Sequence, residues 1–167
     1  VLGGMERNGD EFTGTLTTQL WQRNGGGTPG TPDDDTGVEI LGSTTLSPAN
    51  PGTLEGGTRF RTLESPLTLQ PGSYSIVTSG FGVSDPNGNL GTANADDWES
   101  DDGEGALQFT GRGRFGTAGT FPANADGGPS NRYAAGNLKI LPIADSDIVT
   151  DIGSVMRDSS STVLERI

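Results

Sequence analysis

Short runs of alternating apolar and polar residues recur through the first 141 residues and predict β-strands. The clearest run spans residues 14–22, where Leu16, Thr18 and Leu20 occupy every second position. Because successive side chains of a strand point to opposite faces, these three predict one face directed toward a core. Trp21 falls on the other face of this run, and we expect it to be either a core residue or a contact with another domain. Further strands are predicted at 38–46, 58–63, 106–110, 112–115 and 132–141.

Pro71-Gly72 lies in the middle of the apolar run 67–77 and predicts a tight reversal. Proline fixes one backbone angle, and glycine allows the conformations that a sharp turn requires. Two strands are therefore expected to flank this turn. In the second of them, Tyr74 and Ile76 share one face.

Long polar segments separate the apolar runs and predict loops. Glycine, proline and aspartate are common in them, and the chain as a whole contains 28 glycines and 10 prolines. Short strands joined by many turns are typical of an all-β domain, and 167 residues suffice for a two-layer core. The predicted fold is an antiparallel β-sandwich with long Gly/Asp-rich loops. These loops are expected at 24–37, 47–57, 84–105 and 116–131.

The tail has a different pattern. Ser146 can cap a short helix in which Ile148, Ile152 and Met156 recur at helical spacing. Residues 162–167 then alternate like a strand. We therefore expect residues 1–141 to form the sandwich domain and residues 142–167 to form a junction that leads into a following domain. Since both ends of the chain resemble strands, we expect it to be part of a larger protein.

Composition excludes several classes of function. The net charge is −12 and the pI is about 4.1, so nucleic acid and anionic membrane surfaces are not expected partners. No segment of the sequence is apolar enough for membrane insertion. The chain contains no His and no Cys, which excludes thiol nucleophiles, zinc sites built on these residues and imidazole-based triads. Its acidic residues cluster in Gly-rich loops, whereas paired catalytic carboxylates require a rigid scaffold. We therefore expect no enzyme activity.

Three segments together carry a resemblance to a known group of domains. They are Glu6–Asp10, Leu69–Val77 and Gly128–Leu138. The chain resembles the jelly-roll-type β-sandwich modules of large secreted multidomain proteins of environmental bacteria, which often also carry laminin-G-like, carbohydrate-binding-like or cell-surface sorting modules. The resemblance covers residues 1–141 and begins inside a strand, so a preceding strand is expected. It implies a non-catalytic accessory module that is secreted or displayed at the cell surface, and it transfers no catalytic residue.

Two acidic segments have the composition of a calcium site, because oxygen side chains alternate around a glycine. Calcium is therefore a possible cofactor. The same residue types also form ordinary turns, in which Asn and Asp accept hydrogen bonds from their own backbone. The aspartate run 33–35 is a weaker candidate of the same kind, with a solvated loop as its alternative. The predicted metal ligands are Glu6, Asn8 and Asp10 in the first segment and Asp85, Asn87 and Asn89 in the second.

Several aromatic residues lie in the polar loops and could stack on a sugar ring. Trp98 has only polar and acidic residues around it, so it is either exposed or a plug that holds a loop on the sandwich. Phe121 has the same two interpretations. The predicted ligand-binding residues are Trp98, Phe121, Asn131, Arg132 and Tyr133.

Two functional hypotheses follow from these patterns. The first is an extracellular binding module for glycan or another surface polymer. The second is a structural subunit or spacer of a surface fibre, sheath or adhesin, in which copies of the chain assemble through exposed strand edges.

Overall fold

The computed structural model describes residues 2–5, 13–24, 28, 32–55, 58–85, 105–108, 110, 112–125 and 136–140. Within these ranges the chain forms nine β-strands and one 3-10 turn, and no α-helix. Every strand pair among them is antiparallel, which confirms the predicted all-β, antiparallel class. The elements are β1 (Leu2–Met5), β2 (Leu16–Arg23), η2 (Pro32–Asp34), β3 (Gly37–Leu46), β4 (Thr53–Glu55), β5 (Thr58–Arg61), β6 (Tyr74–Ser79), β7 (Arg114–Phe115), β8 (Asn124–Ala125) and β9 (Gly136–Leu138).

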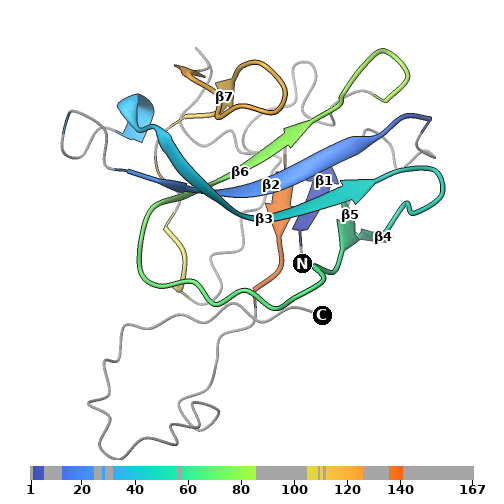
Figure 1. Ribbon diagram of the computed structural model, residues 1–167, viewed down its shortest axis with the longest axis horizontal. Coiled ribbons are helices and arrows are strands. Elements are labelled where there is room, and N and C mark those ends of the chain that lie inside the picture. The colour runs from blue at the N-terminus through green and yellow to red at the C-terminus, as the bar shows by residue number, and fades with distance from the viewer. Residues whose placement is uncertain are drawn as a thin grey trace, which may run out of the picture.

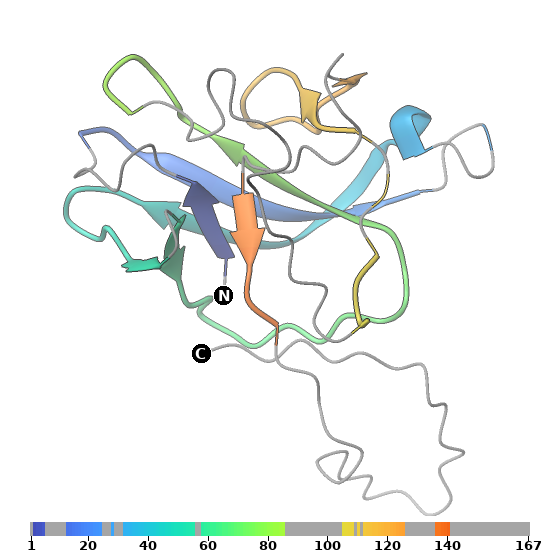
Figure 2. The same cartoon turned by 180° about the vertical axis from the view of Figure 1, so that it is seen from behind.

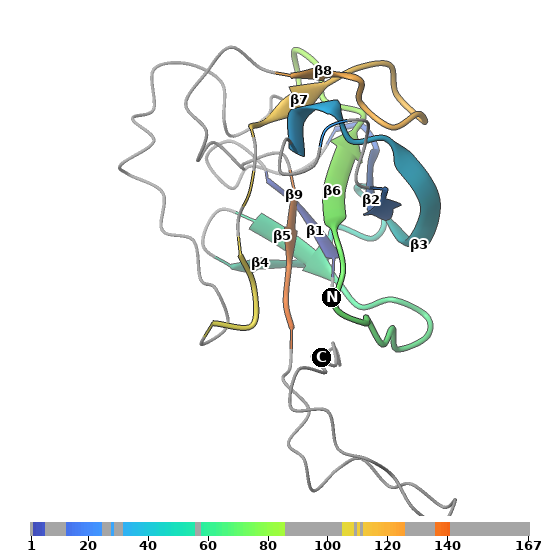
Figure 3. The ribbon, with the colours of Figure 1, turned by 90° about the vertical axis from the view of Figure 1, so that its left-hand side faces the viewer.

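The described strands form three small sheets. One has the order β4-β5-β1-β9, another β3-β2-β6, and the last contains only β7 and β8. The long strands β2 and β3 cross the view in Figure 1, with β1, β5 and β9 behind them. Figure 2 shows the β1–β9 side of the molecule. In the side view of Figure 3, β7 and β8 lie beyond one end of the two larger sheets.

β2 is the central strand of its sheet and follows the predicted alternation. Leu16, Thr18 and Leu20 are buried, whereas the residues between them are half-buried. The Thr18 hydroxyl forms a hydrogen bond with the Thr78 hydroxyl at 2.9 Å, which satisfies both polar groups on the buried face. The alternation along β2 therefore arises because only one face of the strand is buried.

Two hydrophobic clusters lie on the buried face. Leu20 and Leu69 form the larger cluster, and Leu138 of β9 packs against it. Leu16 and Leu46 form the smaller cluster, which Phe81 covers. Full burial of one leucine side chain contributes about 1.5–3 kcal/mol. Since Leu138 belongs to the four-stranded sheet, the larger cluster joins the two larger sheets.

Contacts across β1 depend on a glycine. Gly3 lies opposite both Phe60 of β5 and Asn137 of β9. Because Gly3 has no side chain, the Asn137 amide can reach past β1 and donate to the Thr58 hydroxyl at 2.8 Å. Nζ of Lys139, just after β9, lies 4.6 Å from the centre of the Phe60 ring of β5. The glycine thus allows β5 and β9 to interact over a strand that separates them.

Some predicted strands are wrong. Residues 67–70 are not a strand: Leu67 and Leu69 contact the core as part of a loop, and β6 pairs with β2 instead. Residues 105–106 lie in a turn, and 107, 108 and 110 are not in a strand either. In residues 67–70 the apolar spacing reflects packing against the core without strand pairing. Conversely, β4 and β8 form inside predicted loops through pairing with β5 and β7.

The remaining strand predictions agree with the structure in part. β2, β3, β5 and β6 confirm the strands expected near their positions, and β7 and β9 are shorter than predicted. The predicted helix and strand of the tail lie outside the described residues. No helix in the described part of the chain is long and apolar enough to cross a membrane.

Candidate functional site

Of the predicted site residues, the structure describes Asp85, Phe121 and the aspartate run 33–35. The two single residues have different partners, since Asp85 bonds to Thr13 whereas Phe121 packs against Trp21 and Arg114. The others lie outside the described residues, so their roles stay predictions. These are Glu6, Asn8, Asp10, Asn87, Asn89, Trp98, Asn131, Arg132 and Tyr133.

Asp85 connects the segment after β6 to the segment before β2. Its carboxylate accepts hydrogen bonds from the Thr13 amide at 2.7 Å and from the Thr13 hydroxyl at 2.8 Å. The residue is only 7% exposed. The bond from the Thr13 amide is the main cause that lowers the pKa of Asp85, although burial opposes it. In the described part of the chain, no group of three or more acidic residues lies close enough to hold a metal ion. Asp85 therefore has a structural role as an acceptor, and calcium binding with Asn87 and Asn89 stays a prediction.

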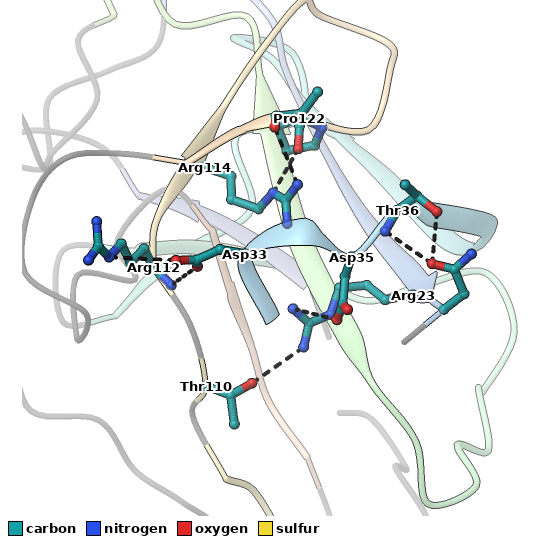
Figure 4. Close-up of polar contacts among 10 residues, drawn as sticks. Arg23, Asp33, Asp35, Thr36, Thr110, Arg112, Arg114 and Pro122 are labelled. Atoms are coloured by element: carbon teal, nitrogen blue, oxygen red, sulfur yellow. Dashed lines mark hydrogen bonds and ion pairs between the residues drawn. The ribbon is translucent and has the colours of Figure 1, made fainter. Parts of the chain in front are cut away.

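The aspartate run lies in and just after η2 and is engaged by arginines. An Asp35 carboxylate oxygen lies 3.4 Å from Nη1 of Arg23, and both side chains are more than nine-tenths buried. Asp33 accepts a hydrogen bond from the Arg112 amide at 3.0 Å and lies 3.6 Å from its Nε. Figure 4 shows how these pairs attach η2 to β2 and to the segment before β7. The run is therefore more than a solvated loop, because two of its three carboxylates fix neighbouring segments.

The loop between β2 and β3 is closed at its base. The Asn24 amide nitrogen of the backbone donates to the Thr36 carbonyl at 3.1 Å. In return, the Asn24 side-chain oxygen accepts from the Thr36 amide at 3.1 Å and from its hydroxyl at 2.8 Å (Figure 4). These bonds hold the two ends of the loop together, which keeps Asp35 beside Arg23.

Arg114 of β7 fixes the loop that carries Phe121. Its Nε donates to the Pro122 carbonyl at 2.9 Å, and its guanidinium carbon lies 5.1 Å from the centre of the Phe121 ring. Burial lowers the pKa of Arg114, and the charge of the nearby Arg23 lowers it further. The guanidinium thus bonds its own loop and stacks on the aromatic ring of that loop.

Phe121 lies against β2 and β3. Its ring meets the Trp21 ring edge-on, with 5.7 Å between the centroids and 65° between the planes. A methyl group added to Gly37 would come within 2.6 Å of the Phe121 ring, so the ring rests on the backbone of β3. This is the loop-holding arrangement that was the alternative to sugar stacking. The glycine at position 37 is what makes room for it.

Trp21 belongs to a sheet face that sequence reasoning did not identify as a site. It lies opposite the buried face of β2, so the expectation of a core residue is wrong. Its Nε1 donates to the Gln19 side-chain oxygen at 3.2 Å. We call the residues that share this side the outer face. By strand register they are Thr17, Gln19 and Trp21 of β2, Ile40, Ser43 and Thr45 of β3, and Ser75, Val77 and Ser79 of β6.

No member of the outer face is buried and none is charged. The alternation in 14–22 was the signal that placed Trp21 away from the leucines. That signal does not say whether a second layer covers the opposite side, and therefore the sequence could not identify an open face.

No protein-family model matches this chain, and no curated protein or solved structure matches it either. The fold and the geometry around Trp21 are thus the basis for a functional inference.

Proposed function

We propose that the chain is a non-catalytic extracellular binding module of a larger secreted protein, and that it recognises glycan or another surface polymer. The proposed fold is a jelly-roll-like β-sandwich. Packing of Leu138 from one sheet against the cluster that contains Leu20 of the other supports a two-layer arrangement. Placement outside the cell rests on the resemblance to modules of secreted bacterial proteins.

The observation that carries the proposal is the arrangement of Trp21 at the end of an open sheet face. The Trp21 ring is half-buried and held on one side by Phe121. The Phe121 loop is in turn fixed by Arg114. A rigid aromatic side chain loses little conformational entropy when a ligand binds, which is why such side chains suit binding surfaces. Hydroxyl and amide groups next to it can bond to the hydroxyls of a sugar.

A non-catalytic role is supported by the composition and by the contacts of the acidic residues. The chain has neither His nor Cys. Asp85, Asp33 and Asp35 each accept structural hydrogen bonds or pair with arginine. Carboxylates engaged in this way are less suited to proton transfer than an unpaired, desolvated one.

The test is retention on a panel of polysaccharides, with and without calcium. We expect the wild-type protein to bind at least one polymer and Trp21→Ala to bind it at least about tenfold more weakly, which corresponds to about 1.4 kcal/mol. Phe115→Ala is the matched control, because Phe115 is an aromatic residue that is 61% exposed on β7. Circular dichroism checks that both variants keep their β-structure. No retention of the wild type on any polymer would contradict the proposal.

A second candidate function has its own supporting observation. β3 lies at the end of the three-stranded sheet, and among the described residues it pairs only with β2. Val38 and Ile40 of this strand are 60% and 40% exposed. An exposed edge with apolar residues can pair with another chain, as expected for a fibre or spacer subunit. Size-exclusion chromatography with light scattering tests this, and Val38→Lys should reduce any assembly. A wild type that stays monomeric at high concentration would exclude it.

A further inference from the structure

The outer face lacks charge in a chain that is strongly charged. The protein has 22 acidic and 10 basic residues and a net charge of −12. The nine outer-face residues nevertheless comprise only hydroxyl, amide, aliphatic and indole side chains. Charged side chains lie at the margins of this face and are engaged there: Arg23 pairs with Asp35 beyond Trp21, and Arg61 donates to the Thr45 carbonyl at 2.8 Å.

We infer that the outer face is the binding surface and that its ligand is a neutral polysaccharide, an inference that rests on the proposed function. The ligand would lie along β2, from Thr17 toward Trp21. Four residues of a strand extend over about 13 Å, so the face is long enough to contact several consecutive sugar rings.

The charge distribution disfavours the other occupants of the outer face. An anionic polymer would be repelled by the net negative charge, and the guanidinium groups of Arg23 and Arg61 at the margins are already engaged by Asp35 and by the Thr45 carbonyl. A cationic polymer would be attracted by the net charge, but it would find no carboxylate among the nine outer-face residues. A second copy of the chain carries the same net charge, which opposes its approach. A neutral polyol has none of these disadvantages, and its hydroxyls both donate and accept hydrogen bonds, as Ser and Thr do.

The face is organised in three rows across the sheet, about 7 Å apart along the strands. The first row contains only hydroxyl side chains, the second contains the Gln19 amide, and the third contains the indole. Gln19 accepts the hydrogen bond from Trp21, which fixes the orientation of both side chains. The rows are Thr45, Thr17 and Ser79, then Ser43, Gln19 and Val77, then Ile40, Trp21 and Ser75.

The experiment adds one charge in the middle row of this face, on β3. Ser43 is exposed and lies opposite Gln19, so Ser43→Glu places a long carboxylate where the ligand would lie. That carboxylate must lose water or displace the ligand, and we expect binding to a neutral polysaccharide to weaken at least about tenfold. Thr68→Glu adds the same charge at an exposed position in the loop before Pro71 and is the matched control. Thr45→Glu is a second variant on the face, in case Ser43→Glu disturbs folding.

Affinity electrophoresis in gels with neutral, anionic or cationic polysaccharide measures the result at low and high salt. The expected result is salt-independent retardation by a neutral polymer, lost in Ser43→Glu and kept in Thr68→Glu. Equal binding by both variants would overturn the location of the surface and leave the proposed function standing. Retardation only by a charged polymer would overturn the ligand class. No retardation of the wild type by any polymer would overturn the proposed function itself.

Discussion

The carboxylate of Asp85 holds two segments together that are 72 positions apart in the chain, and Asp85→Asn tests what this contact contributes. In the wild type, both carboxylate oxygens accept hydrogen bonds from Thr13, at 2.7 and 2.8 Å. The substitution keeps the shape of the side chain and removes its charge. One amide oxygen can still accept the bond from the Thr13 amide. The Thr13 hydroxyl must rotate and accept from the new NH₂ group instead.

The magnitude follows from the type of bond. A hydrogen bond to a charged group contributes about 1.5–3 kcal/mol, and one between neutral groups about 0.5–1.5 kcal/mol. Thr13 is exposed, so water can replace a lost partner and the lower ends of these ranges apply. Two bonds that change from charged to neutral then lower the free energy of unfolding by about 2 kcal/mol at pH 7.

The pH dependence has a definite sign. The pKa of Asp85 is lowered in the folded protein. Its ionised form therefore adds stability above the unfolded-state pKa of about 3.9, and this contribution is lost as pH falls through the lower folded-state pKa. A protonated Asp85 resembles an asparagine. The difference between wild type and Asp85→Asn should consequently close as pH falls below about 4.

Urea unfolding at a series of pH values, followed by tryptophan fluorescence, measures this difference. Glu64→Gln is the control, because it removes one carboxylate from an exposed position. We expect the control to follow the wild type within about 0.5 kcal/mol. A difference for Asp85→Asn that stays constant from pH 7 to pH 3 would refute the reasoning, as would an Asn variant as stable as the wild type at pH 7.

Three further predictions concern the backbone, a buried ion pair and calcium. Gly80 has a φ of 102°, and a methyl group there would lie 2.1 Å from the Thr15 carbonyl oxygen, whereas Gly119 has a φ of 80° and open space around it. Gly119→Ala should lower the free energy of unfolding by about 1 kcal/mol, and Gly80→Ala should lower it clearly more. Equal losses for the two variants in urea unfolding would contradict this prediction. Arg23→Met removes the partner of the buried Asp35 and should lower the free energy of unfolding by about 3 kcal/mol. The double variant Arg23→Met/Asp35→Asn should recover part of this loss. Strictly additive effects of the two substitutions would argue against the ion pair. If the acidic segments bind calcium, millimolar calcium should raise the Tm relative to EDTA, and an unchanged Tm would exclude that site.

Strand predictions succeeded where one face of a strand is buried. The alternation of Leu16, Thr18 and Leu20 is a direct consequence of that geometry, so β2 could be predicted closely. The same signal misled at Leu67 and Leu69, which contact the core from a loop. Burial produces apolar spacing whether or not the backbone pairs with a neighbour. Strand pairing without burial produces no apolar spacing. For this reason β4, whose three residues are all exposed, was expected to be a loop.

The candidate site shows the same limit. Phe121 is an aromatic residue in a polar loop, and its sequence context is compatible both with sugar stacking and with holding the loop on the sandwich. Its contacts with Trp21, Gly37 and Arg114 come from three separate parts of the chain. No local sequence pattern predicts contacts between segments that are so far apart in the chain. The arginine partners of the aspartate run were missed for the same reason.

Local alternation and composition were enough to predict the antiparallel all-β class, the central strand and the lack of His and Cys side chains. Which side of β2 is covered became visible in the packing of distant segments. Alternation divides a strand into two faces, but long-range packing determines which of them receives a second layer. Within the described part of the chain, the leucine face is buried, whereas none of the nine outer-face residues is buried or charged. That difference is the reason the proposed binding surface lies on the sheet and not only in the loops.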